Sequence, residues 1–370
     1  MEPSTVPITL LRAAGGSRAI FAMNRSQTPL ESGSTAERLV QLGGLLRHEV
    51  RGALRTQSRT ELTAIASVGV GDHTFGIDVV AERAVDRWLE EMAATGPLSL
   101  LTEDTGWRHV GPQGPLRDFD HGGPRISLDP IDGTRNLMHE LRPAWVIAAA
   151  CGPGTDAPRI GDVEVGALIE IPCLDSVRAR ELVALRSKGL RCRSVPLGPQ
   201  PPSPNDEQPL WEPAAPLDEQ ARLDGGYFPF FGFEPRCRAA AQELSARVFE
   251  RLENDLGIDT ESVLDDQYIS SGGQLALLAL GTYRAIIDAR LSLGNARGFT
   301  ARTAKPYDVA GAILVAEEAG AVVRGVDGGP LDFPLDATTP IEFCGYANDA
   351  TFRALAPLIR AALSGLAESD

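Results

Sequence analysis

Lysine is nearly absent from this chain of 370 residues, because only Lys188 and Lys305 among its 35 Lys and Arg residues are lysines. The 50 acidic residues outnumber the basic ones, so the formal net charge is −15. Nucleic-acid-binding proteins usually carry a basic face, and no cluster of basic residues appears here. We therefore expect no nucleic-acid partner. An acidic protein still binds an anionic substrate when a bound metal ion reverses the local field.

Long apolar runs and regularly spaced cysteines are also missing. No apolar run approaches the ~20 residues that cross a bilayer, so we expect no membrane partner. The cysteines number five and include no C-x-x-C pair. An odd number of scattered cysteines argues against a disulfide framework and favours a reducing compartment. The expected location is therefore the cytoplasm.

The length allows two subdomains around substantial cores. We expect a mobile extension over 1–33, an α+β subdomain over 34–194, a Pro-rich insertion over 195–225 and a second α/β subdomain over 226–370. Eight prolines in 196–216 exclude a regular helix or a central strand. This stretch is a linker, a partner-docking strand or a lid, with the first two favoured. For the aromatic residues in 227–233, we favour core packing or oligomer contact over a substrate platform.

The most informative stretch is Asp129-Pro130-Ile131-Asp132-Gly133-Thr134. An apolar strand should stop at Pro130, since proline has no N–H for a sheet. Gly133 permits a tight turn, and Thr134 suits the start of a helix. Two carboxylates suit a hard cation, and the N–H groups of a helix start attract phosphate. The stretch therefore predicts a site that binds a cation and an anion together.

Three further acidic pieces accompany it. The predicted strand over 98–101 runs into Glu103-Asp104, and Asp78 begins a helix with an apolar stripe. Tyr307-Asp308-Val309-Ala310-Gly311 stands at the head of another predicted helix. Taken alone, adjacent acids are usually a solvated loop, while Asp78 and Asp308 are typical N-caps. A shared metal site with the central stretch is the alternative interpretation of these residues.

The D-P-I-D-G-T string resembles the signature of the inositol monophosphatase family, Mg²⁺-dependent and lithium-sensitive sugar-phosphate phosphatases. The resemblance covers roughly 34–363 and is greatest to archaeal-type inositol monophosphatase/fructose-1,6-bisphosphatase members. It implies an α+β fold, a layered αβαβα arrangement with the metal site between two subdomains. It also implies a homodimer.

The resemblance assigns roles to particular residues. Two or three Mg²⁺ ions would be held by Glu103, Asp129, the Ile131 carbonyl, Asp132 and Asp308. Glu103, Thr134 and Asp78 would be catalytic, with Thr134 orienting the attacking water. The residues expected to bind substrate are Asp132, Gly133, Thr134, Ser270, Ser271, Asp288 and Lys305.

The implied reaction releases phosphate from inositol monophosphate or a related sugar phosphate. Fructose-1,6-bisphosphatase and bisphosphate nucleotidase activities are the alternatives within the family. A catalytically weak regulatory or binding member is the alternative of another class, since the chain has a Pro-rich insertion and Asp104 where the family usually has Glu. The expected partner is a small-molecule phosphate ester.

Overall fold

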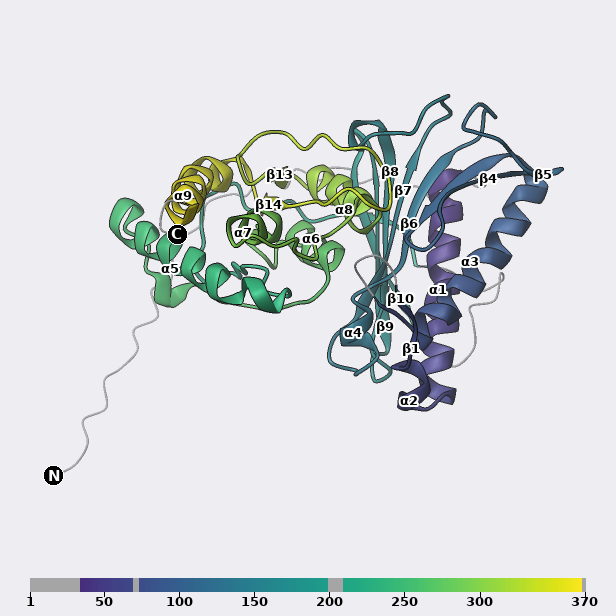
Figure 1. Cartoon of the computed structure of the whole chain (residues 1–370), viewed down its shortest axis with the longest axis horizontal. Helices are drawn as coiled ribbons and strands as arrows, with labels where there is room; N and C mark the ends of the chain where they lie inside the picture. The colour runs from purple at the N-terminus through teal and green to yellow at the C-terminus, as the bar shows by residue number, and fades with distance from the viewer. Residues whose placement is uncertain (1–33, 69–72, 199–208, 368–370) are drawn as a thin grey trace, which may run out of the picture.

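The computed structural model describes residues 34–68, 73–198 and 209–367. Helices and sheets alternate in five layers: two helices, a nine-stranded sheet, two helices, a three-stranded sheet and two helices (Figure 1). The predicted α+β class and αβαβα layering are confirmed. The predicted extension over 1–33 lies outside the described residues, as do 69–72. No helix in the described ranges has the length and apolar character needed to cross a membrane.

The large sheet contains both strands that lead into the acidic motifs. Its order is β11 (Glu212–Pro213), β10 (Gly189–Pro196), β9 (Arg178–Leu185), β8 (Val163–Ile171), β7 (Ala144–Cys151), β6 (Arg125–Asp132), β3 (Leu98–Thr102), β4 (Gly106–Gly111) and β5 (Gly114–Pro115). Only β3 and β6 pair in parallel, with Leu101 opposite Ser127. Because parallel strands end at the same edge, Glu103 after β3 and Asp129 in β6 come together.

The outer face of this sheet is covered by α1 (Thr35–Thr56) and α3 (Gly76–Thr95). Ser34 caps α1, its hydroxyl accepting a hydrogen bond from the Glu37 N–H. The apolar stripe of α1 is fully buried against the sheet at Leu39, Leu42 and Leu46. Between the two helices lie α2 (Arg59–Leu62) and a hairpin of β1 (Ile65–Val68) and β2 (His73–Phe75).

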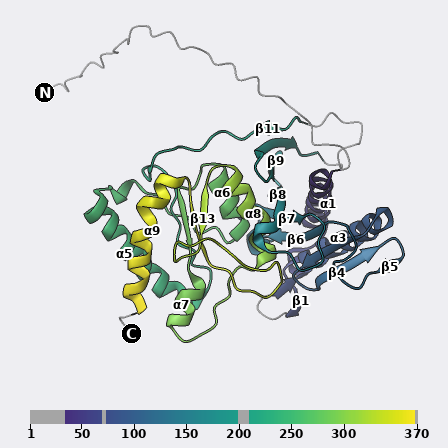
Figure 2. The ribbon, with the colours of Figure 1, turned by 90° about the horizontal axis from the view of Figure 1, so that it is seen from above.

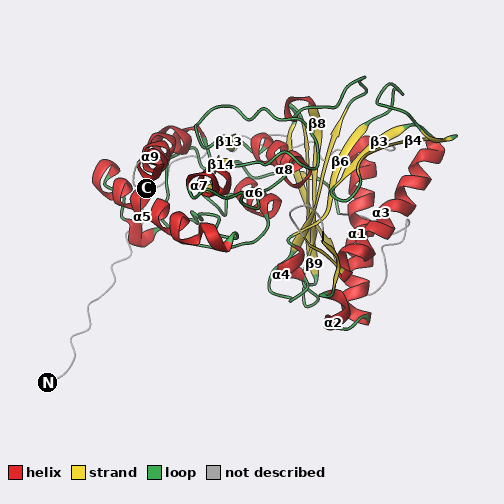
Figure 3. Ribbon diagram, viewed as in Figure 1, coloured by secondary structure: helices red, strands yellow, loops and turns green. Residues whose placement is uncertain are grey.

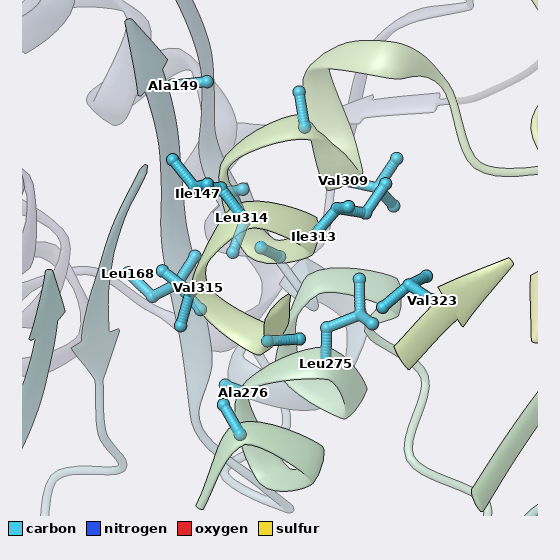
Figure 4. Packing of buried hydrophobic residues seen from close by; sticks show 14 of the residues in the cluster. Ile147, Ala149, Leu168, Leu275, Ala276, Val309, Ile313, Leu314, Val315 and Val323 are labelled. Carbon is cyan, nitrogen blue, oxygen red and sulfur yellow. The ribbon is translucent and has the colours of Figure 1, made fainter. Parts of the chain in front are cut away.

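The inner face carries α6 (Ser271–Ala279) and α8 (Pro306–Glu318), which pack between the sheet and β13 (Val322–Arg324), as Figure 4 shows. Helix α8 lies directly on the strand backbones. A Cβ on Gly311 would stand 2.1 Å from the Ala148 carbonyl oxygen, and a Cβ on Gly166 would stand 2.5 Å from the Gly311 oxygen. These two glycines therefore set how closely α8 approaches β7 and β8.

The small sheet has the order β12 (Ala285–Asp288), β14 (Phe343–Tyr346), β13 and is antiparallel throughout. Its outer face is covered by α5 (Arg238–Leu256) and α9 (Asp349–Ala367) (Figures 2 and 3). Two shorter helices are α4 (Thr134–Leu137) and α7 (Arg290–Ala296). Phe228 and Phe230 are buried in the core beneath α5 and α9, which confirms core packing for these two aromatic residues.

Two predicted boundaries are wrong. Strand β6 does not stop at Pro130 but continues to Asp132, and its register with β7 shifts between Asp129 and Asp132. The irregularity removes the proline from the hydrogen-bonded ladder. The residues over 265–271 also predict a short strand, and that described segment contains none. Helix α6 begins at Ser271, because the Ser270 hydroxyl accepts from the Gly273 N–H and caps it there.

The described ends of the Pro-rich insertion lie at one edge of the large sheet, and 199–208 fall outside the described residues. Pro196 ends β10, and Pro213 belongs to the edge strand β11, where a missing N–H is tolerated. Trp211 is buried beneath the Arg193 guanidinium, 4.4 Å from the ring centroid. The division into subdomains at 194 and 226 stays a prediction.

Candidate active site

Three acids meet where the parallel strands end and α8 begins. Asp129 lies in β6, and its Oδ1 accepts from the Ile131 N–H at 2.9 Å. Asp308 lies in the first turn of α8, and its Oδ2 accepts from the Lys305 N–H at 2.7 Å. Glu103 follows β3, and the Tyr307 hydroxyl hydrogen-bonds its side chain. The acids predicted from separate motifs are thus brought to one place.

Electrostatics show how close these acids are. Burial, followed by the negative charges of Asp308, Asp132 and Glu103, raises the pKa of Asp129 well above its ordinary value. Burial, followed by the charge of Asp132, does the same to the pKa of Asp308. Like charges disfavour each other's ionised form when they are close and poorly solvated. The cluster therefore carries negative charge that the protein leaves only partly compensated.

Asp132 differs because it is held by the start of α6. Its Oδ2 accepts from the Ser270 hydroxyl at 2.7 Å and from the N–H groups of Gly272 and Gly273 at 2.7 and 3.1 Å. Burial raises the pKa of Asp132 to about 6, although these donors act in the opposite direction. Ser270, expected to contact substrate, thus directs its hydroxyl to Asp132.

The turn after β6 places Thr134 beside Asp78. Gly133 has a φ of 100°, in the left-handed region that favours glycine. The Thr134 hydroxyl lies 2.9 Å from Asp78 Oδ1 and 2.8 Å from the Ile131 carbonyl oxygen. It has one proton and donates to one of them at a time. Asp78 is also fixed by the Phe75 N–H, which donates to its Oδ2 at 2.8 Å.

Comparisons with known proteins identify the arrangement. No family model matches the chain. A fructose-1,6-bisphosphatase/inositol-1-monophosphatase of Methanothermobacter thermautotrophicus is 26% identical over 282 residues, covering 75% of this chain and 80% of the relative. A solved inositol monophosphatase–fructose 1,6-bisphosphatase superposes with a TM-score of 0.60 at 14% identity, over 89% of this chain and 99% of that one. The chain has the inositol monophosphatase fold.

A second solved structure agrees with this assignment. A Pyrococcus horikoshii protein described as having similarities to inositol-1 monophosphatase superposes with a TM-score of 0.56 at 16% identity, over 88% of this chain and 96% of that one. The resemblance predicted from the D-P-I-D-G-T string is confirmed. These names belong to the enzyme class predicted from the sequence, the phosphoric monoester hydrolases.

One acid of the site was missed by sequence reasoning. Glu82 lies one turn after Asp78 on α3 and hydrogen-bonds Asp104. Burial, and then this contact with Asp104, raises the pKa of Glu82 to about 8. Residues four apart on a helix share a face, so the spacing of Asp78 and Glu82 was the available signal.

The remaining predicted substrate residues lie in different surroundings. Ser271 is the first residue of α6 and is 8% exposed. Asp288 is 1% exposed, and both its carboxylate oxygens accept from the Arg290 guanidinium, at 2.8 and 2.6 Å. Its charge is therefore neutralised within the protein. Burial lowers the pKa of Lys305, while Asp308 and Arg290 act on it in opposite directions, so Lys305 lies between the acids and Arg290.

An arginine cluster, also missed from the sequence, surrounds the half-buried ring of Phe233. The guanidinium carbons of Arg135, Arg302 and Arg290 lie 4.7, 5.6 and 6.0 Å from the ring centroid. Arg135 directly follows Thr134 in α4. Arg302 is fixed through its N–H, which donates to Glu234 at 3.3 Å. Arg290 and Arg302 are ion-paired with Asp288 and Glu234, so the positive charge beside the turn that follows the acids is partly compensated.

The donor set fits a hard cation. In the described ranges, no group of three or more His, Cys, Asp or Glu side chains is already arranged to hold a metal ion. The nearby donors are nevertheless carboxylate and carbonyl oxygens, which Mg²⁺ prefers. The raised pKa values of Asp129 and Asp308 mark negative charge that a divalent cation would compensate. The chemistry of the site fits Mg²⁺.

Proposed function

We propose that this protein is an Mg²⁺-dependent phosphomonoester hydrolase acting on inositol monophosphate or a related sugar phosphate. The supporting observation is the half-buried cluster of Asp129, Asp132 and Asp308, in which neighbouring acids raise the pKa values of Asp129 and Asp308. It adjoins a helix start at Gly133 and Thr134, and such a start is favourable for phosphate. The pairing of a cation site with an anion site is what phosphate-ester hydrolysis requires.

Five groups would hold two or three Mg²⁺ ions: Glu103, Asp129, the Ile131 carbonyl, Asp132 and Asp308. When bound, Mg²⁺ supplies Lewis-acid activation of water and neutralises charge on the phosphate and the leaving oxygen. In the absence of the cation, the negative charges of neighbouring acids disfavour the ionised forms of Asp129 and Asp308. The cation would compensate this repulsion.

Thr134 and Asp78 would orient the attacking water. When the Thr134 hydroxyl donates to Asp78, its oxygen lone pairs are left to accept a hydrogen bond from water. That contact turns a lone pair of the water toward the phosphorus. The first N–H groups of a helix have no partner within the helix, so the start of α4 would bind the phosphate oxygens. No covalent phosphoenzyme is needed.

A bisphosphate is the second candidate substrate. Arg135, Arg302 and Lys305 place positive charge close to the predicted phosphate turn in a chain that is otherwise acidic. A second phosphate on a sugar would meet this charge. The relative from Methanothermobacter thermautotrophicus is named for both activities. A substrate of the fructose 1,6-bisphosphate type is therefore favoured over a nucleotide, because the sequence has no evident signature of a purine pocket.

The test is phosphate release from a panel of sugar phosphates, inositol phosphates and nucleotides, with and without Mg²⁺ and with added Li⁺. We expect release that requires Mg²⁺ and is inhibited by Li⁺. Folded protein that releases no phosphate from any ester would contradict the proposal and favour a binding or regulatory role.

The same panel separates the two substrate classes. Arg302→Ala should lower kcat/KM for a bisphosphate more than for a monophosphate. Arg251→Ala on the outer helix α5 is the control and should change neither. Equal effects of Arg302→Ala on both substrates would remove the bisphosphate candidate. A cytoplasmic homodimer is also expected from the resemblance, and light scattering tests the oligomeric state.

A further inference from the structure

Two predicted cation ligands are held by donors from the other half of the molecule. Asp132 ends β6 of the large sheet, and its Oδ2 receives donors from Ser270, Gly272 and Gly273 at the start of α6. Glu103 follows β3 of the same sheet and is hydrogen-bonded by Tyr307 of α8. Both contacts cross from the inner helices to the sheet.

Ser270 connects the helix start to the carboxylate. It is 2% exposed, its hydroxyl donates to Asp132 at 2.7 Å, and the same oxygen accepts from the Gly273 N–H at 2.9 Å. One side chain thus caps α6 and fixes Asp132. Both bonds are sheltered from water, where a lost hydrogen bond to a charged group has its greatest effect.

The two glycines after Ser271 explain how the backbone reaches the carboxylate. A Cβ on Gly272 would lie 2.9 Å from Asp132 Oδ2 and 2.5 Å from the Ile147 side chain. A Cβ on Gly273 would lie 2.3 Å from the Ser270 hydroxyl oxygen. A side chain at either position would push the helix start away from Asp132. Gly272-Gly273 therefore permits the close approach of the two N–H donors.

We propose that Ser270 and the start of α6 position Asp132 for cation binding. The three donors fix one carboxylate oxygen, which restricts the rotation of the side chain and thereby sets the direction of the other oxygen. This inference rests on the proposed function only in taking Asp132 as a cation ligand. Groups that fix a metal-binding carboxylate commonly change metal affinity or activity by roughly 10–100-fold when removed.

A consequence is that cation affinity depends on the packing of α6 against the large sheet. The positioning donors belong to α6, while Asp132 belongs to β6. Movement of α6 would release Asp132 without altering any ligand. Tyr307 and Glu103 provide the same type of connection through α8.

The experiment measures the Kd for Mn²⁺, a paramagnetic substitute for Mg²⁺, by electron paramagnetic resonance without substrate. Three variants separate positioning from helix capping. Ser270→Gly removes the hydroxyl but leaves an acceptable N-cap residue, whereas Ser270→Ala removes both the hydroxyl and the favourable cap. Ser34→Ala removes the serine cap of α1, which is in contact with none of the predicted ligands.

We expect Ser270→Gly and Ser270→Ala to weaken Mn²⁺ binding about tenfold or more. Ser34→Ala should bind Mn²⁺ like the wild type while melting at a lower temperature. The Tm of Ser270→Gly without metal should fall less than that of Ser270→Ala.

Wild-type affinity in Ser270→Gly would overturn the proposal, as would a wild-type protein that binds no divalent cation. Wild-type protein that binds Mn²⁺ but releases no phosphate would contradict the proposed function alone. In that case the loss of affinity in the Ser270 variants would still support the positioning role.

Discussion

Two carboxylates of the large sheet, the buried Glu181 and the half-buried Asp129, have opposite surroundings. Glu181 in β9 is 1% exposed, and its two oxygens pair with Arg47 of α1 at 2.8 Å and Arg193 of β10 at 2.6 Å. Asp129 in β6 has its pKa raised by burial and by three neighbouring acids. The fold compensates the first carboxylate with its own arginines. No arginine of the described ranges pairs with the second, and this difference is what the proposed cation site would explain.

The largest expected effect is on catalysis. Asp129→Asn removes a predicted ligand and should reduce Mg²⁺-dependent phosphate release at least about 100-fold, the scale seen when one electrostatic contact to a transition state is lost. The metal-free protein should be no less stable, because the substitution relieves repulsion. Phosphate release and thermal unfolding without metal test both points. Retained turnover in folded Asp129→Asn would refute the site.

The matching substitution at Glu181 should lower stability and leave turnover unchanged, the opposite of the result expected for Asp129→Asn. Glu181→Gln leaves Arg47 and Arg193 without their shared carboxylate and should lower the free energy of unfolding by about 3–5 kcal/mol. Urea unfolding measures the loss. Turnover per folded molecule should stay near the wild-type value at low temperature. A stable variant with impaired turnover would show that Glu181 acts on the site.

Added Mg²⁺ should stabilise the acid cluster. At about 100 times its Kd, the ion should raise the free energy of unfolding by about 2.7 kcal/mol. Thermal unfolding with Mg²⁺ and with Na⁺ at equal ionic strength measures the difference. Glu181→Gln should keep this increment, whereas Asp129→Asn should lose most of it. An equal increment in Asp129→Asn would place the bound ion elsewhere.

The smallest effect concerns the hydrogen-bonded cluster of Ser99, His109 and His121. Unlike Glu181 and Asp129, its members carry no charge when both histidines are neutral. The Gly123 N–H donates to His121 Nδ1 at 3.0 Å, so His121 Nε2 carries its proton and donates to Ser99, 2.7 Å away. The Ser99 hydroxyl then donates to His109 Nδ1, also at 2.7 Å. Burial lowers the pKa of both histidines, although Asp118 opposes this shift at each and Asp120 also opposes it at His121.

A lowered pKa in the folded state means that protonation favours unfolding. The contribution of the neutral histidines to the free energy of unfolding is complete above their unfolded pKa of about 6.5. It is lost as the pH falls below that value. Urea unfolding at pH 7.5 and pH 5.5 should show this loss. His121→Asn should show a smaller difference between the two conditions. An identical difference in the variant would assign the pH dependence to other groups.

The sequence predicts most of the fold and the acids of the site. Asp129, Asp132 and Asp308 were found because each stands at a recognisable boundary between a strand or loop and a helix. Apolar periodicity predicted the position of helix α3. The end of β6 was misplaced, because a register shift that accommodates Pro130 depends on the neighbouring strand β7.

Other features depend on contacts between distant parts of the chain. The position of Asp288 in the sequence does not show whether its carboxylate faces a substrate pocket or pairs with Arg290, as it does in the structure. Phe233 and Arg135 are about a hundred residues apart, and no spacing rule connects them. Ser270 was expected near substrate, but its donation to Asp132 depends on where α6 packs. Sequence patterns therefore identify chemical groups more readily than they identify the partners of those groups.

The glycine contact beneath α8 has a consequence for sequence variation. Gly311 and Gly166 let the backbone of α8 contact the backbones of β7 and β8 directly. This backbone contact fixes how far Asp308, at the start of α8, lies from the sheet that carries Asp129. Apolar residues elsewhere around α8 are therefore free to diverge without moving that spacing. A side chain at either glycine would instead force the α8 backbone away from the sheet.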